Sequence, residues 1–174
     1  MAKRSLIPVE GLSKETQSFY DVLNSEPDLS VVLVAVSYID ACLGALLERF
    51  LLKSSVSEKL LDPRSGALGS FGARADAGYS LGLVEKPLYQ DLLVLSELRN
   101  QFAHHHLALN FSIPAVVEQC EKLSYAADLK DGSSSNPLMP ASLLEHPRNR
   151  FVLSVVLISQ RLLLVGLGVK RVQA

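Results

Sequence analysis

Apolar residues recur along most of the chain at the three- and four-residue spacing of an α-helix. No segment shows the convincing two-residue alternation of a half-buried strand. The pattern therefore predicts an all-α protein, a single-domain helical bundle of about seven helices. The expected helices cover about 13–24, 29–53, a short stretch ending near Leu61, 68–81, 87–104, 114–127 and 148–168.

Helix-start and helix-stop residues support these limits. Asp28 is the expected N-cap of the longest helix, and Gly82 is a plausible C-terminal stop. Pro87 and Pro114 each stand in the first turn of a predicted helix, where the missing N–H costs nothing. Residues 130–147 are rich in Gly, Ser and Pro and read as a loop. One domain over 1–174 follows, with its core in about 13–125 and a C-terminal helix over 148–168.

Two predicted helices are apolar on most of their circumference. The segments 31–52 and 151–169 approach the roughly 20 residues that span a bilayer. The first contains Asp40 and the second contains Arg161 near its centre, where a charge in lipid costs about 3 kcal/mol. We therefore interpret both as core helices and expect no membrane association. Short helices cannot easily cover two such rods, so we expect a homodimer with one of them at the interface; a compact monomer is the alternative.

Composition and charge narrow the class of protein. The chain has 174 residues with 17 basic and 18 acidic side chains, a formal net charge of -1. A chain this close to neutral lacks the broad basic footprint that nucleic-acid binding usually requires, so no direct DNA binding is expected. Cys42 and Cys120 lie far apart in predicted helices, match no metal spacing and are expected to be free thiols in a cytoplasmic protein.

The densest group of reactive side chains is ELRNQFAHHH, residues 97–106. Asn100 and His104 are four residues apart and share a helix face, whereas Arg99 points about 140° away from His104. Arg99 shares its face with apolar and small residues, and a buried guanidinium needs an acceptor. The structural interpretation makes Arg99 a clamp that binds Asp40 on the long helix, with Asn100 and the histidines satisfying helix-end carbonyls.

A catalytic interpretation of the same residues stays open. An arginine that holds a phosphate and a histidine that accepts the 2′-hydroxyl proton can cleave RNA without metal. Arg99, Asn100 and His104 would be the catalytic residues, in two sets brought together across a dimer. The adjacent histidines 104–106 diverge on a helix, and only His146 remains elsewhere, so no metal site is expected. No phosphate loop or nucleophile elbow follows a strand, so no cofactor is expected.

The segment LGSFGARADAGYSLGLVEKPLYQDLLVLSELRNQFAHH resembles the central block of the mannitol operon repressor family. The long apolar helix before it, VAVSYIDACLGALLERFLL, also fits, and the resemblance covers about 28–125. The matching positions are Gly66, Leu68, Gly69, Phe71, Arg74, Tyr79, Leu81, Gly82, Leu83, Tyr89, Asp91, Leu92, Arg99, Asn100, Phe102, Ala103 and His104.

This resemblance implies an all-helical cytoplasmic homodimer that controls transcription of sugar-alcohol uptake genes without a helix-turn-helix. Such a protein would act by protein–protein contact with a partner from a transcription or sugar-uptake system. The Arg-Asn-x-x-x-His motif is also similar to that of the HEPN superfamily, which implies the ribonuclease alternative for Arg99, Asn100 and His104. We expect the non-enzymatic regulator.

Overall fold

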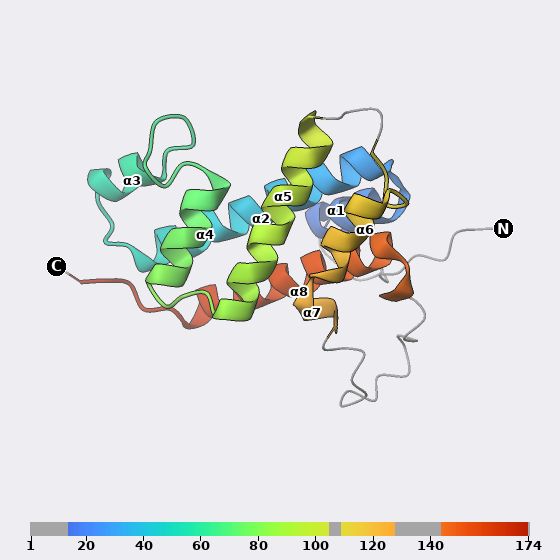
Figure 1. Ribbon diagram of the computed structural model, residues 1–174. Coiled ribbons are helices and arrows are strands. Elements are labelled where there is room, and N and C mark those ends of the chain that lie inside the picture. The colour runs from blue at the N-terminus through green and yellow to red at the C-terminus, as the bar shows by residue number, and fades with distance from the viewer. Residues whose placement is uncertain (1–13, 105–108, 128–143, 174) are drawn as a thin grey trace.

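The computed structural model describes residues 14–104, 109–127 and 144–173, which form eight helices and no strand (Figure 1). The prediction of an all-helical bundle is confirmed for these residues. The helices are α1 (Lys14–Ser25), α2 (Asp28–Phe50), α3 (Ser55–Leu61), α4 (Phe71–Ser80), α5 (Lys86–His104), α6 (Pro114–Glu121), α7 (Ser124–Ala127) and α8 (Pro147–Gly168).

The two long apolar helices, α2 and α8, pack along each other and run in the same direction (Figure 1). At their first turns Arg148 of α8 binds the Asp28 carboxylate of α2. At their last turns Arg49 Nη1 donates to the Gly166 carbonyl at 3.1 Å. Contacts at both ends fix the register of the pair.

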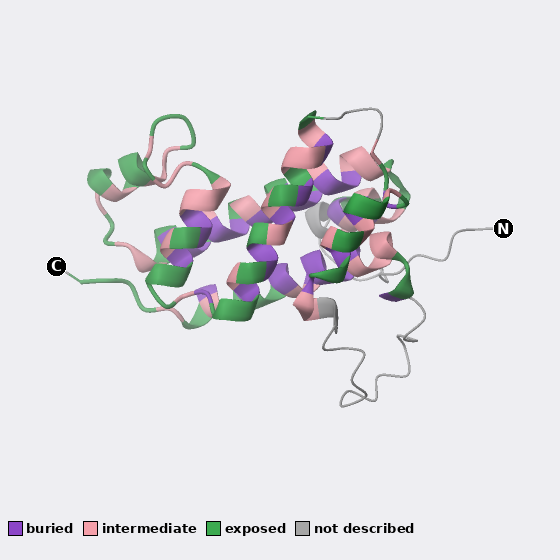
Figure 2. Ribbon diagram, viewed as in Figure 1, coloured by how far each residue is buried: buried purple, intermediate pink, exposed green. Residues whose placement is uncertain are grey.

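The remaining helices cover this pair. The α1, α4 and α5 helices pack against α2, while α6 and α7 pack against α8. Figure 2 shows buried residues concentrated on the inner sides of α2, α5 and α8. Three phenylalanines join the layers, with the Phe102 and Phe111 ring centroids 5.8 Å apart and those of Phe111 and Phe151 5.4 Å apart. One core therefore connects the described helices other than α3, which has no buried residue.

By length and composition, both α2 and α8 could cross a membrane. In the fold, 44% of the most apolar stretch of α2 and 56% of that of α8 is buried inside the protein. This is the packing that we expected of core helices, although α8 is covered unevenly. Residues 151–156 are all buried, whereas Leu163, Leu164 and Leu167 are 51%, 62% and 73% exposed.

Several sequence-based boundaries differ in detail. Asp28 is the first residue of α2 and not its N-cap, which is Pro27; its carboxylate accepts from Arg148 and from the Phe111 N–H. The expected helix over 114–127 is broken into α6 and α7, because the buried Asp91 accepts both backbone N–H groups at the start of α7. Gly82 ends α4 with φ of 71°, as expected. Most of the predicted loop, 130–143, lies outside the described residues.

Candidate functional site

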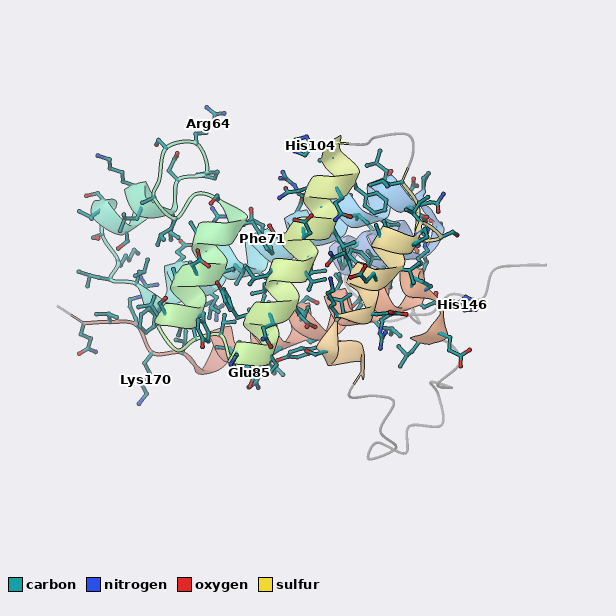
Figure 3. All side chains as sticks on the ribbon, viewed as in Figure 1. Arg64, Phe71, Glu85, His104, His146 and Lys170 are labelled. Atoms are coloured by element: carbon teal, nitrogen blue, oxygen red, sulfur yellow. The ribbon has the colours of Figure 1, made fainter. Side chains whose placement is uncertain are left out.

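The predicted reactive residues lie at the end of α5. Arg99 is exposed and donates through Nη1 to the Asn100 Oδ1 at 3.2 Å. Asn100 is half-buried, and His104 is the exposed last residue of the helix (Figure 3). The structure thus brings Arg99 and Asn100 together on an exposed helix end; His105 and His106 lie outside the described residues.

The opposite face of α5 explains this exposure. Leu95, Leu98 and Phe102 are all at most 1% exposed and follow the spacing of a helix face turned to the core. Arg99 lies at the border of that face, and its long side chain extends into solvent. The position that looked buried in the sequence is therefore a surface position.

The prediction that Arg99 clamps Asp40 is wrong. The partner of Asp40 is Arg74 of α4, whose Nη1 lies 2.9 Å from the Asp40 Oδ1. Arg74 is 7% exposed, and it also donates from Nε to the Leu68 carbonyl at 2.9 Å and from Nη2 to the Leu61 carbonyl at 3.1 Å. The internal arginine clamp exists, but Arg74 provides it.

A glycine makes room for this clamp. A Cβ on Gly44 would lie 3.5 Å from the Arg74 guanidinium, so the guanidinium packs directly over the α2 backbone one turn after Asp40. Arg74 itself lies in a helix of small residues, FGARADAGYS, which lets α4 approach α2 closely. These two features of the sequence could have identified Arg74 in place of Arg99.

A second polar cluster, missed in the sequence, joins α7, α8 and the residue before α5. The Tyr125 hydroxyl donates to the Glu85 Oε1 at 2.6 Å, and Arg161 Nε donates to the same oxygen at 3.2 Å. The hydrogen bond from Tyr125, with help from Arg161, lowers the pKa of Glu85. Burial and the bond to Glu85 raise the pKa of Tyr125. At neutral pH the cluster is a carboxylate held by a phenol and a guanidinium.

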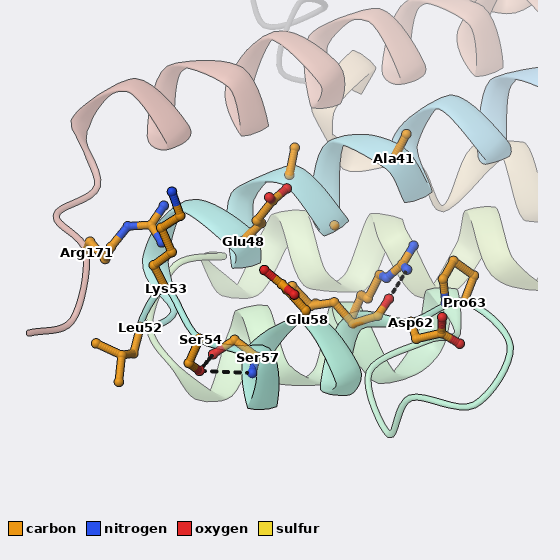
Figure 4. Close-up of a pocket in the computed structure, with 14 residues that line it drawn as sticks. Ala41, Glu48, Leu52, Lys53, Ser54, Ser57, Glu58, Asp62, Pro63 and Arg171 are labelled. Atoms are coloured by element: carbon orange, nitrogen blue, oxygen red, sulfur yellow. Dashed lines mark hydrogen bonds between the residues drawn. The ribbon is translucent and has the colours of Figure 1, made fainter. Parts of the chain in front are cut away.

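An open groove of about 670 Å³ lies between α2 and α3 (Figure 4). Its floor is made of small α2 residues, Ala41, Gly44 and Ala45. Glu48 and Glu58 line it as well, with Lys53 and Arg171 at the end nearer the C-terminus. Carboxylates and cations thus share one solvent-open groove, and no single sign of charge dominates it.

In the described part of the chain, the side chains favour neither a metal site nor a reactive thiol. No group of three or more His, Cys, Asp or Glu side chains comes together there to hold a metal ion. Cys42 and Cys120 are free and buried, and burial raises their pKa values to about 11 and about 12. Both thiols are therefore protonated at neutral pH and are poor nucleophiles.

No protein-family model and no curated protein sequence matches the chain. A chain in the X-ray structure of the MtlR-HPr complex from Escherichia coli does match in fold, with a TM-score of 0.65. The alignment covers 85% of this chain and 97% of that chain, at 21% sequence identity. MtlR is the mannitol operon repressor. The fold is mannitol-repressor-like. The resemblance read from the central block of the sequence is thereby confirmed at the level of the fold.

Proposed function

We propose that this protein is a non-enzymatic regulator that works by binding a protein partner, an HPr-type carrier of a sugar-uptake system. The observation that carries the proposal is the shared fold with a chain solved in the MtlR-HPr complex. The match extends over nearly all of that chain, so the similarity covers the whole architecture and is not confined to one helical hairpin. We further propose that the protein is a cytoplasmic homodimer.

Control of transcription would then be indirect. The formal net charge of -1 gives no broad attraction to a phosphate backbone. Three arginines bind carbonyl or carboxylate groups within the fold and are therefore not available to a phosphate backbone: Arg49, Arg74 and Arg148. The protein would change expression of uptake genes through its partner, and a reporter fused to such an operon would respond to deletion of this gene.

Calorimetric titration with purified HPr tests whether an HPr-type carrier is the partner of this protein. We expect a saturable complex with one HPr per chain, because the chain shares the fold of a chain solved in a complex with HPr. Absence of heat at HPr concentrations that saturate MtlR in parallel would refute the carrier proposal.

Ribonuclease activity is the second candidate, favoured by the exposure of Arg99 and His104 at one helix end. Their side chains could reach a phosphate and a 2′-hydroxyl only if a second set completed the cleft. We expect no cleavage when the protein is incubated with a mixed RNA substrate. The matched variants are His104→Ala and His146→Ala, both at exposed histidines. Cleavage lost in the first variant and kept in the second would replace our proposal with the nuclease.

A further inference from the structure

Two carboxylates reach into the open groove between α2 and α3. Glu48 comes from α2 and Glu58 from α3, as Figure 4 shows. Within the described residues, neither side chain forms an ion pair. Asp62 also lines the groove, but its Oδ1 already accepts three hydrogen bonds from Arg64 and Ser65 in its own turn. Glu48 and Glu58 therefore leave negative charge in the groove that no described cation offsets at close range.

Two cations stand at one end of the same groove. Lys53 follows α2, and Arg171 belongs to the C-terminal tail that follows α8. The tail is anchored there, because the Val172 N–H donates to the Phe50 carbonyl at 2.8 Å and Arg171 Nη1 donates to the Leu51 carbonyl at 3.3 Å. A carbonyl does not neutralise a guanidinium, and the ion pairs of the described chain do not include Lys53. Positive charge thus remains at this end.

The floor of the groove, further from the two cations, is apolar. It is made of three residues with no atom beyond Cβ: Ala41, Gly44 and Ala45. Arg74 packs over Gly44, but Asp40 balances its charge at 2.9 Å. Such a floor leaves room for a hydrocarbon group and favours its removal from water.

These three surfaces follow one another along α2. The apolar floor ends at Ala45, Glu48 comes about 4.5 Å further along the helix axis, and Lys53 follows the end of the helix. A ligand that matches all three needs an apolar group, a cation and an anion in this order. An α-amino acid carries these three groups on one carbon, as a side chain, an ammonium and a carboxylate.

We propose that this groove binds a zwitterionic α-amino acid with an apolar side chain. The ammonium lies between Glu48 and Glu58, and the carboxylate faces Lys53 and Arg171. The side chain lies on the floor of small α2 residues. The groove volume of about 670 Å³ is within the roughly 300–1,000 Å³ that small-molecule sites occupy.

The paired charges also select against simpler ions. An amine without a carboxylate is attracted by Glu48 and Glu58 but repelled by Lys53 and Arg171. An anion without an ammonium meets the reverse. Only a ligand with both charges gains from both pairs, so the groove discriminates by repulsion as well as by attraction.

Calorimetric titration with leucine and two molecules of the same carbon skeleton tests the ligand class. The first, 4-methylpentanoate, lacks the ammonium, and the second, 3-methylbutylamine, lacks the carboxylate. We expect saturable binding of leucine and at least about tenfold weaker binding of each analogue and of glycine, which has no apolar side chain. Absence of saturable binding with leucine, valine and phenylalanine alike would overturn the proposal. An analogue that binds as tightly as leucine would do the same.

Two variants test the orientation of the ligand. Glu58→Gln should weaken leucine and 3-methylbutylamine about threefold and leave 4-methylpentanoate unchanged, since an exposed charge pair contributes little. Arg171→Met should weaken leucine and 4-methylpentanoate and leave the amine unchanged. Glu97→Gln is the matched control, because Glu97 is exposed on α5 and lies outside the groove.

Far-ultraviolet circular dichroism checks that each variant is folded. Folded variants that weaken the same ligands, or that weaken none, would show the proposed orientation to be wrong. This site does not depend on the HPr-type carrier proposed above. A protein that binds leucine and ignores HPr would refute the carrier alone, whereas a protein that binds HPr and no amino acid would refute the groove alone.

Discussion

Replacing Arg74 by Ala is expected to lower the free energy of unfolding by about 3 kcal/mol, because a buried ion pair loses one partner. The change removes the 2.9 Å ion pair with Asp40 and leaves the Leu61 and Leu68 carbonyls without their donor. It also empties the space above Gly44. Asp40 is 31% exposed, so water can solvate its carboxylate in the variant and limit the loss. Urea unfolding followed by circular dichroism measures the effect.

Arg99→Ala is the matched control for this prediction. Arg99 is exposed and donates a hydrogen bond to its neighbour Asn100, so the free energy of unfolding should change by no more than about 0.5 kcal/mol. The order of the two variants is the test. If Arg99→Ala destabilised the protein as much as Arg74→Ala, the assignment of the clamp to Arg74 would be wrong.

Asp91→Ala should cost a similar amount, about 3 kcal/mol, because it removes a fully buried acceptor and leaves three part-buried donors without their partner. The Asp91 carboxylate is 0% exposed and accepts from the Ser124 N–H, the Ser124 hydroxyl and the Tyr125 N–H at 2.9 to 3.1 Å. Without it, α7 loses the cap that starts it beside α5 and α8. Thermal unfolding should show a clearly lower midpoint.

Asp76→Ala is the comparison for Asp91. Asp76 is exposed and accepts a hydrogen bond from the Tyr89 hydroxyl at 2.7 Å. Its loss should cost no more than about 1 kcal/mol, since the freed hydroxyl can bond to water. The two aspartates carry the same charge, so the larger loss of stability expected for Asp91→Ala would come from the burial of Asp91. Equal midpoints would contradict the capping role of Asp91.

Much of the fold could be predicted from the sequence because helix periodicity and punctuation agree. The limits of α5 and α8 were placed within one residue, and Gly82 was expected at the end of α4. The break between α6 and α7 was missed, since it depends on Asp91, more than 30 residues earlier in the chain. A local pattern cannot report an acceptor that arrives from another helix.

The partner of Asp40 was missed for a related reason. On a helical wheel Arg99 lies beside apolar and small residues, and this made it look buried. Burial of an arginine depends on what covers it, and the cover over Arg74 comes from Gly44 and the small residues of α4. Asp40 was correctly singled out as the acceptor of an arginine, but only the tertiary structure shows that this arginine is Arg74.

The parallel packing of α2 and α8 has a consequence for how the chain reaches its native state. The contacts that fix this pair, Asp28 with Arg148 and Arg49 with Gly166, join positions 120 and 117 residues apart. Contacts over such sequence separations form slowly, because a long loop must close first. On the ribosome, α2 is synthesised well before α8, so the apolar surface of α2 stays uncovered by α8 while the segment between them is made. Folding of this domain is therefore expected to finish only after α8 has been synthesised.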